Sequence, residues 1–439
     1  MTLLVLAAGS VAAVGATSEY EIDEVSEVGT VWSGHPVGFC LVTAGARQFV
    51  AYYDEARRMT VAARRPGETE WRFVRLGERI GWDSHNYITM MVDDEGLIHL
   101  SGNMHCVPLV YFRTSAPGDI TTFERISAMT GRLEKRCTYP RFFRGPKKEL
   151  LFTYRDGGSG NGNQIYNMYE PAGRQWRPLL EAPLTDGEGK MNAYLRGPML
   201  GPDGYYHLCW VWRDTPDCAT NHDLSYARSR DLIHWTKSDG TPIGLPMRLG
   251  TAEVVDAVPV GGGMINGNTA IGFDRKGRVV ISYHKHDAKG HTQIYNARRE
   301  EQGWKNYQAS DWDYRWEFSG GGSISFEIRA QPVRWEQGKL VQDYSHKQYG
   351  SGTWVLDEKT LKPTGTLARL RRYPKRLNTL ESDFSGMWVN IRGDSGTSGD
   401  PTVIYLIRWE TLGRNRDRPR KGPLPAPSML RVYKMKKAE

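Results

Sequence analysis

Short runs in which apolar and polar residues alternate recur along this chain, and each follows a turn that contains aspartate and glycine. The first run is Leu97-Ile98-His99-Leu100, which comes after Asp93-Asp94-Glu95-Gly96. Related runs follow Gly201-Pro202-Asp203-Gly204 and Phe273-Asp274-Arg275-Lys276-Gly277. Alternation with a period of two is typical of a strand with one buried face. The pattern predicts a turn followed by a strand at each of these three places.

A second strand signal, centred on a tyrosine, recurs at similar distances. The tyrosines stand 55, 60 and 69 residues apart, at Tyr111, Tyr166, Tyr226 and Tyr295. A further aromatic residue follows each tyrosine after roughly ten residues, at Phe123, Trp176, Trp235 and Trp304. Repeats of this length, made only of short strands and glycine-rich turns, are typical of the blades of a β-propeller.

The repeat leads to a prediction for the whole chain. Helical periodicity is nearly absent, and the segment from Ser229 to Trp235 resembles a degenerate Asp-box, a hairpin turn of sialidase-like propellers. Dividing the 439 residues by about 60 residues per blade gives about seven blades. We therefore predict an all-β fold, a seven-bladed β-propeller forming one catalytic domain over 17–439. A last strand at 429–433, after a proline-rich loop at 419–427, is expected to complete the first blade.

The first residues have a different composition. Residues 3–16 are apolar and rich in small side chains, but the run is too short to span a bilayer. Small residues at Val14-Gly15-Ala16 suit cleavage before Thr17, so we expect 1–16 to be the remnant of a signal peptide and the protein to be secreted or periplasmic. A truncated or misassigned start is the alternative. No later segment is long and apolar enough for a membrane span, so no membrane partner is expected.

Cysteine and charge narrow the classes further. The five cysteines have no CxxC spacing, which argues against a disulfide scaffold and a zinc ribbon. Cys209 and Cys218 could be grouped with His207 and His222 as a metal cluster, although buried strand residues with one loop bridge are the simpler interpretation. The net charge of +8 suits an acidic polysaccharide, sulfated or not. No nucleic-acid motif accompanies the charge, so nucleic acid is not an expected partner. We expect the protein to be a monomer.

Four polar residues at strand ends are candidates for chemistry, because the loops at one end of a propeller channel converge. His85 precedes one strand and His105 ends it, while Tyr139 and Arg155 stand 16 residues apart around the next predicted strand. Each has an ordinary alternative. A buried tyrosine is more often bonded to backbone than catalytic, and Arg155 could simply pair with Asp156.

Several motifs resemble those of one family. The segments Asp83–Tyr87, Ser101–His105, Tyr139–Arg141 and Phe152–Gly157 are similar to those of the BNR-repeat-containing polysaccharide lyases. These are seven-bladed propellers that include ulvan lyases and lyases of rhamnosyl-glucuronate ends. The resemblance covers most of the chain from about residue 25. It implies cleavage of α-L-rhamnosyl-(1→4)-D-glucuronate linkages by β-elimination, with a 4,5-unsaturated uronate as product and ulvan as the expected substrate.

The chemistry of elimination assigns roles to the candidates. A guanidinium, here Arg155, can neutralise the carboxylate next to the carbon that loses H5. Tyr139 is expected to protonate O4 and also to act as a base, which needs a nearby cation such as Arg155 because a phenol has a pKa of about 10. By resemblance, His85 provides or shares the base function, and His105 orients substrate or His85.

Sugar-binding neighbours are expected at Asn86, Tyr194 and Arg196. The reaction requires no cofactor, and a structural metal ion such as calcium or zinc is left open. An exo-acting rhamnose-glucuronate lyase and an α-L-rhamnosidase acting on arabinogalactan side chains are alternatives, as is a sialidase. A glycan-binding propeller without activity is a further alternative. Hydrolases usually need a carboxylate pair, which the motifs lack.

Overall fold

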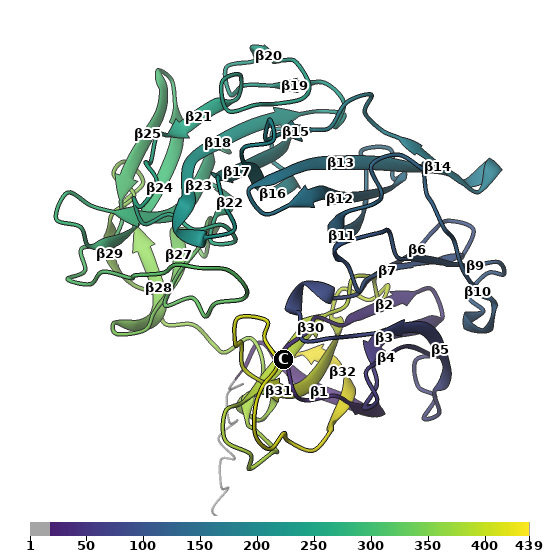
Figure 1. The fold of residues 1–439 in the computed structure, drawn as a ribbon. Coiled ribbons are helices and arrows are strands. Elements are labelled where there is room, and N and C mark those ends of the chain that lie inside the picture. Colours follow the sequence, from purple (N-terminus) through teal and green to yellow (C-terminus); the bar gives the residue numbers. More distant parts are fainter. Residues whose placement is uncertain (1–17, 439) are drawn as a thin grey trace, which may run out of the picture.

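The computed structural model describes residues 18–438, and in this range it contains no α-helix (Figure 1). The predicted leader, 1–16, lies outside the described residues. Short 3-10 helices connect some strands, namely η1 (Ser84–Asn86), η2 (Ile120–Thr122), η3 (Pro171–Gly173), η4 (Cys218–Thr220) and η5 (Lys375–Asn378). Nothing helical in the described range has the length and apolarity that crossing a membrane requires. The predicted all-β class is confirmed.

Two antiparallel four-stranded sheets follow the N-terminal strand. The first has the order β2 (Cys40–Ala44), β3 (Arg47–Tyr53), β4 (Arg58–Arg64) and β5 (Arg72–Arg79). The second has the order β10 (Phe123–Arg125), β9 (Tyr111–Thr114), β7 (Ile98–Ser101) and β6 (Thr89–Val92). The strand predicted after the first acidic turn is therefore β7.

The middle of the chain forms a twelve-stranded sheet that contains two antiparallel runs. The first run comprises β8 (His105–Val107), β11 (Cys137–Arg144), β12 (Leu150–Gly158), β13 (Asn161–Glu170), β14 (Gln175–Pro178) and β15 (Thr185–Asp186). The second comprises β16 (Asn192–Leu200), β17 (Tyr206–Arg213), β18 (Asn221–Ser229), β19 (Trp235–Thr236), β20 (Pro242–Ile243) and β21 (Glu253–Asp256). One parallel pair, Gly162 with Asn192, joins the runs.

Three more four-stranded sheets complete the chain. The first comprises β22 (Ala270–Phe273), β23 (Val279–His286), β24 (Thr292–Glu300) and β25 (Gly303–Gln308). The second comprises β26 (Ile328–Glu336), β27 (Lys339–His346), β28 (Gly350–Leu356) and β29 (Pro363–Thr366). The third has the order β1 (Tyr20–Val31), β32 (Ser428–Lys437), β31 (Val403–Leu412) and β30 (Met387–Gly393). The predicted last strand exists as β32, but it pairs with β1 and β31 rather than completing the sheet β2–β5. Figure 1 shows the sheets following one another around a ring.

The repeated aspartate, histidine and tyrosine have a structural role. His99 donates through Nε2 to Asp93 at 3.1 Å, and its Nδ1 accepts from the Tyr111 hydroxyl at 2.7 Å. His207 makes the same two bonds, to Asp203 at 2.9 Å and from Tyr226 at 2.6 Å. Both histidines are buried. These two repeats thus tie the turn to the tyrosine strand by a satisfied buried network, whereas in the third repeat Asp274 pairs with Arg278.

The predicted Asp-box forms the hairpin between β18 and β19. Asp231 Oδ1 accepts from the backbone N–H groups of Ile233 and His234 at 2.9 and 2.8 Å. Leu232 has a φ of 63°, in the left-handed region that a tight turn needs. Trp235 is buried just after the turn, so the aromatic residue of the repeat anchors the outer strand to the core.

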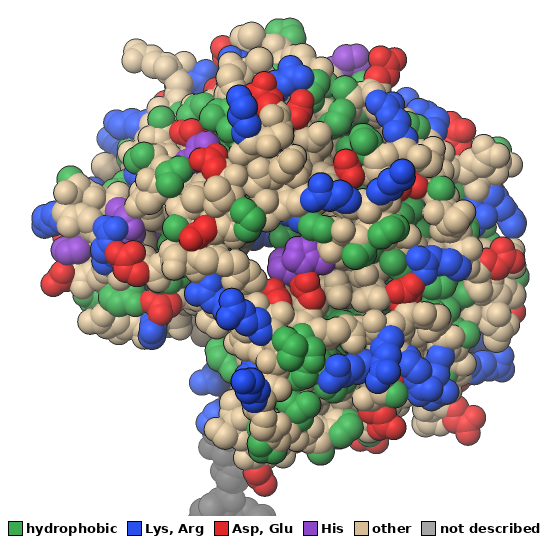
Figure 2. Space-filling model, viewed as in Figure 1, with side chains coloured by type: hydrophobic (Ala, Val, Ile, Leu, Met, Phe, Trp, Pro, Cys, Tyr) green, Lys and Arg blue, Asp and Glu red, His purple; other side chains and the backbone are tan. Residues whose placement is uncertain are grey.

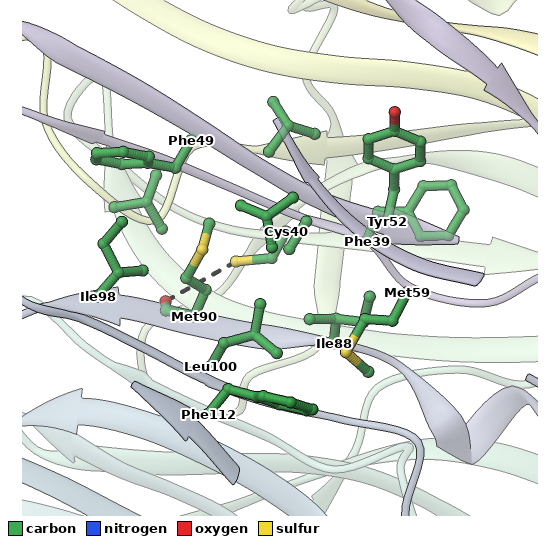
Figure 3. Close-up of a cluster of buried hydrophobic side chains, with 14 of the residues drawn as sticks. Phe39, Cys40, Phe49, Tyr52, Met59, Ile88, Met90, Ile98, Leu100 and Phe112 are labelled. Carbon is green, nitrogen blue, oxygen red and sulfur yellow. Dashed lines mark hydrogen bonds between the residues drawn. The ribbon is translucent and has the colours of Figure 1, made fainter. Parts of the chain in front are cut away.

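Apolar side chains from neighbouring sheets fill the space between them. Figure 3 shows one such cluster, in which Cys40, Phe49 and Met59 of the first sheet face Met90 and Leu100 of the second. All five side chains are buried. Burial of this apolar surface, at about 25 cal/mol per Å², holds adjacent sheets together where no backbone hydrogen bonds connect them.

The cysteines are all free and form no loop bridge. Cys209 and Cys218 lie in different buried clusters. His207 is held by Asp203 and Tyr226, as described above, while His222 bonds to Asp214 and Asp223. The grouping of these residues as a metal cluster is therefore not supported.

Candidate active site

One large cavity of about 950 Å³ collects residues from several sheets. It is lined by five of the seven predicted site residues, namely His85, His105, Tyr139, Arg155 and Tyr194. In Figure 2 a hollow opens at the centre of the molecule, and histidine side chains lie at its edge. Residues far apart in sequence therefore share one site.

A single carboxylate holds the two histidines. Asp83 precedes η1, and its Oδ1 accepts from the backbone N–H of His85 at 2.9 Å and from His85 Nδ1 at 2.6 Å. Its Oδ2 accepts from His105 Nδ1. The imidazole rings lie 4.2 Å apart, centroid to centroid. Because Nδ1 of His85 is engaged and Nε2 makes no hydrogen bond with any described residue, Nε2 remains for substrate.

The shared carboxylate also sets the charges. Burial alone would raise the pKa of Asp83, but hydrogen bonds from His105 and His85 hold it well below its usual range. Burial alone would lower the pKa of His105, but its bond to Asp83 prevails and raises that pKa to about 9. His105 is therefore an imidazolium at neutral pH and has no lone pair to accept a proton.

An irregularity in β11 sets the direction of the Tyr139 side chain. The register of β11 against β12 shifts between Thr138 and Arg141, and Tyr139 has a φ of 60°. Such a bulge re-aims a side chain, and a left-handed residue other than glycine is uncommon. The tyrosine ring lies 5.5 Å from the His85 ring, centroid to centroid. Its hydroxyl makes no hydrogen bond within the described part of the chain.

Arg155 reaches Tyr139, yet it does not make the tyrosine a base. The guanidinium carbon lies 4.9 Å from the Tyr139 ring centroid. Burial, reinforced by Tyr194, nevertheless raises the pKa of Tyr139, and the opposing effect of Arg155 is smaller. Arg155 therefore acts in the expected direction, but burial outweighs it, so Tyr139 stays protonated and can serve as an acid.

Arg155 itself is buried, with only 1% of its surface exposed. Its Nη2 donates to Thr138 Oγ1 at 3.2 Å and to Cys106 Sγ at 3.5 Å, and Nε has no partner. No carboxylate of a described residue, Asp156 included, lies within 4.0 Å of it. A buried guanidinium without a carboxylate partner is costly unless an anion binds there.

Tyr194 completes the wall beside Arg155. Its hydroxyl accepts from Arg155 Nη1 at 3.4 Å and exchanges a hydrogen bond with Ser159 Oγ at 2.6 Å. The other two predicted binding residues do not line the cavity. Asn86 packs in η1 with a buried side-chain oxygen, and the exposed Arg196 donates to the Thr269 carbonyl at 2.9 Å.

Two residues that the sequence analysis gave no role are central. Asp83 could have been found from the preference of aspartate for the residue before a short helix. Asp417, in the loop between β31 and β32, accepts from Ser84 N and His35 Nε2, both at 3.0 Å, and from Ser323 N at 2.8 Å. Oδ2, which accepts from Ser323, also lies 3.5 Å from His85 Nδ1. Asp417 thus connects its own loop to three segments, around His35, Ser84–His85 and Ser323.

Cys106 was also missed, and it lines the cavity next to His105. Hydrogen bonding with His105 lowers the pKa of its thiol to about 6, with smaller contributions from Thr138 and Arg155. A thiolate here would add a negative charge close to Arg155. The residue is one of the few other than glycine with positive φ, at 56°.

The same cluster was tested for a metal ion. Ligand atoms of Asp83, His85 and His105 lie within 4.8 Å of one another, the only such group of three among residues 18–438. Both histidines already bond to Asp83 through Nδ1, so these three groups satisfy one another without an ion. The residues therefore fit a hydrogen-bonded cluster better than a metal site, and a structural calcium or zinc ion stays a prediction.

Comparison with known proteins identifies the family of this chain. A family described as BNR repeat-containing family member matches residues 47–312, more than half of the chain, so the chain belongs to this family. The resemblance stated from the motifs is confirmed at this level. A comparison with curated proteins gives no match.

Solved structures of polysaccharide lyases are similar over nearly the whole chain. The crystal structure of polysaccharide lyase Uly1 has a TM-score of 0.61 at 14% identity, covering 95% of this chain and 99% of that chain. A PL25 ulvan lyase bound to -[GlcA(1-4)Rha3S]- has a TM-score of 0.57 at 13% identity, covering 92% and 94%. At such identities the likeness establishes a common fold.

Proposed function

We propose that this protein is a polysaccharide lyase that cleaves α-L-rhamnosyl-(1→4)-D-glucuronate linkages by β-elimination, with ulvan as the first substrate to test. The observation that carries the proposal is the buried Arg155, which has no carboxylate partner and lies beside a protonated tyrosine and an available imidazole. Support comes from the similar fold of a lyase bound to a glucuronate-rhamnose unit.

Arg155 neutralises the substrate carboxylate. Loss of H5 places negative charge on C5 and the carboxylate, and a guanidinium fixed in a dry pocket stabilises that charge without reorganising. Thr138 and Tyr194 hold the guanidinium from two sides at 3.2 and 3.4 Å. The carboxylate would take the place of the missing ion-pair partner.

His85 and Tyr139 divide the proton transfers. His85 Nε2 takes H5 as the C4–C5 double bond forms, and the C4–O4 bond breaks as the Tyr139 hydroxyl protonates O4. H5 and O4 lie on the same face of a glucuronate ring, which suits two groups whose rings are 5.5 Å apart. A proton then passes back from the imidazolium to the phenolate, directly or through water.

A hydrolase on this scaffold is less well supported. Most glycosidases need two carboxyl groups about 5 to 9 Å apart, and among the described residues no aspartate or glutamate lines the cavity. Asp83 and Asp417 are occupied by histidine and backbone donors. A protein that only bound glycans would not need Arg155, Tyr139 and His85 together in one cavity.

The finer features of the fold belong to the same proposal. The five separate sheets and the two runs of the twelve-stranded sheet would be the blades of a seven-bladed propeller. Secretion or periplasmic export, and a monomeric state, complete the proposal. An acidic polysaccharide outside the cell is the substrate that such a location would offer.

The test is the product formed from ulvan and, in parallel, from gum arabic. β-Elimination yields a conjugated uronate that absorbs ultraviolet light, and no water is added to the product. We expect this absorbance to rise with chain cleavage on at least one substrate. New reducing ends without the absorbance would identify a hydrolase, and binding without cleavage would identify a glycan-binding protein.

A further inference from the structure

The cavity contains more positive charge than one carboxylate requires. Its lining includes five arginines, Arg155, Arg213, Arg329, Arg392 and Arg414, and no carboxylate of a described residue lies within 4.0 Å of any of them. Arg155 belongs to the catalytic group, and Arg213 is held by backbone carbonyls between β17 and β18. The remaining three are unexplained by the proposed reaction.

These three arginines come from different elements, and two of them share one aromatic neighbour. Arg329 lies on β26, Arg392 on β30, and Arg414 in the loop after β31. The guanidinium carbons of Arg329 and Arg414 lie 5.0 and 5.9 Å from the centroid of the same Phe326 ring. Within 18–438, the side chains of Arg329 and Arg392 make no hydrogen bond, while Arg414 donates to the Ile324 carbonyl at 2.8 Å.

Burial lowers the pKa of Arg329, and repulsion by Arg414 lowers it further. Burial also lowers the pKa of Arg414, and repulsion by Arg392 adds to this effect. Like charges gathered in a concave wall repel one another unless an anion lies between them. The three side chains are exposed to the cavity, so an incoming ligand can reach them.

An exposed tryptophan adjoins this charge. Trp388 on β30 lines the cavity and is 61% exposed, the most of any large hydrophobic residue described. Its indole rests on Gly413, where an added Cβ would lie 2.9 Å from Trp388 Nε1. A large aromatic face left open in a cavity suits stacking on the apolar face of a sugar ring.

We propose that Trp388, Arg329, Arg392 and Arg414 form a second subsite, which binds another sugar of the same polysaccharide through an anionic group, either a carboxylate or a sulfate ester. This inference rests on the proposed function. The subsite adjoins the catalytic residues. Arg414 donates to the Ile324 carbonyl, the neighbouring Ser323 N–H donates to Asp417, and Asp417 lies 3.5 Å from His85 Nδ1. The enzyme should therefore prefer chain segments with two anionic groups over a single uronate end.

The test compares Arg329→Ala/Arg414→Ala with the wild type on sulfated ulvan tetrasaccharide and on the same oligosaccharide after desulfation. Loss of two charge-assisted contacts should raise KM about tenfold or more with little change in kcat. Arg65→Ala/Arg79→Ala is the charge-matched control, since both residues are exposed and outside the cavity lining, and its KM should stay near that of the wild type. A KM change confined to the sulfated substrate assigns the site to a sulfate ester. A change with both substrates assigns it to a carboxylate.

Calorimetric binding of the same oligosaccharides to a Tyr139→Phe background separates the subsite from the reaction. Weaker binding by the double variant, relative to its control, supports the subsite even if no unsaturated product is ever formed. Trp388→Ala should weaken binding more than Trp388→Phe, which keeps a stacking ring. Wild-type affinity and KM in the arginine variant would overturn the subsite and leave the lyase proposal standing.

Discussion

At the scale of single residues, the main feature of this site is one carboxylate that accepts hydrogen bonds from two imidazoles. Asp83 fixes the Nδ1 atoms of His85 and His105, and it makes one histidine a cation while the other keeps a ring nitrogen for substrate. Two histidines of the same chemical type thereby acquire different duties. The difference lies in their surroundings, which the sequence motif does not reveal.

Replacement of Asp83 by asparagine should therefore impair catalysis with modest loss of stability. We expect kcat to fall about tenfold or more, because His85 loses the acceptor that orients it. NMR titration should show the pKa of His105 falling from about 9 toward 6.5. Asp94→Asn is the control, since that exposed carboxylate lies in the same region of sequence and only pairs with Arg144. Unchanged histidine titration in Asp83→Asn would contradict the arrangement.

The same pair gives stability a defined pH dependence. The pKa of His105 is raised from 6.5 to about 9 in the folded state, so the stabilisation is fully present below pH 6.5 and is lost as pH rises through about 9. The melting temperature of the wild type should therefore converge on that of Asp83→Asn between these pH values. A difference that stays constant across this range would refute the ion pair.

For single residues, the sequence identified only those functional side chains that lie within a recognisable motif. Tyr139, Arg155 and the two histidines could be selected because their motifs and spacing resemble a family. Their expected places at strand ends were partly wrong, since Tyr139 and Arg155 lie inside β11 and β12 and His105 begins β8. Asp417 could not, because it lies 382 residues from its partner His35 and no local pattern links them. The contacts of Arg196 and Asn86 depend on loop positions that spacing does not determine.

At the scale of elements, the site depends on how β12 and β13 hold Arg155. Gly162 on β13 packs against the arginine, and a Cβ there would lie 2.8 Å from Arg155 Cδ and 2.8 Å from Asn192 Oδ1. The same glycine makes the parallel pair that joins the two runs of the large sheet. Neither contact leaves room for a side chain.

Gly162→Ala should thus displace Arg155 and lower activity by on the order of tenfold to a hundredfold, as expected for misplacement by a fraction of an ångström. Overpacking should also cost about 1–3 kcal/mol of unfolding free energy. Gly77→Ala is the matched control, because an added Cβ on β5 meets nothing within 4 Å. Kinetics and denaturant unfolding measure both effects, and wild-type turnover in Gly162→Ala would show that the packing is irrelevant to Arg155.

Hairpins and repeats were predictable at this scale, whereas some pairings were not. The tyrosine strands and the Asp-box hairpin follow from local alternation and turn residues, and all appear in the structure as β9, β13, β18 and β24. No periodic pattern in the sequence indicates the parallel pair at Gly162 or the bulge at Tyr139. They arise from packing between sheets, which is a tertiary effect.

At the scale of the whole molecule, the first and last strands are joined. β1 pairs with β32 from Tyr20–Lys437 to Val31–Ser428, which places the N-terminal strand at the edge of the last sheet. The sequence predicted the last strand but placed it in the first blade, because strand alternation does not specify which neighbours a strand joins. The loop that contains Asp417 connects β31 to this final strand.

A chain ending at Pro427 should fail to fold, because removal of β32 exposes two strand edges and takes the buried Leu430, Val432 and Met435 out of two apolar clusters. A chain ending at Lys437 is the control and keeps every pair of β1 with β32. Soluble yield and melting temperature distinguish them. A stable, active product of the shorter chain would disprove that the joined strands hold the sheets together.

The most direct test of the central claim is the rate of unsaturated uronate formation by Tyr139→Phe on ulvan, with the melting temperature measured on the same samples. The Tyr139 hydroxyl has no hydrogen-bond partner in the described structure, so its removal should change stability by less than about 1 kcal/mol. Without the acid for O4, the rate should fall at least about 10²-fold. A folded Tyr139→Phe protein that forms the product at the wild-type rate would contradict the mechanism.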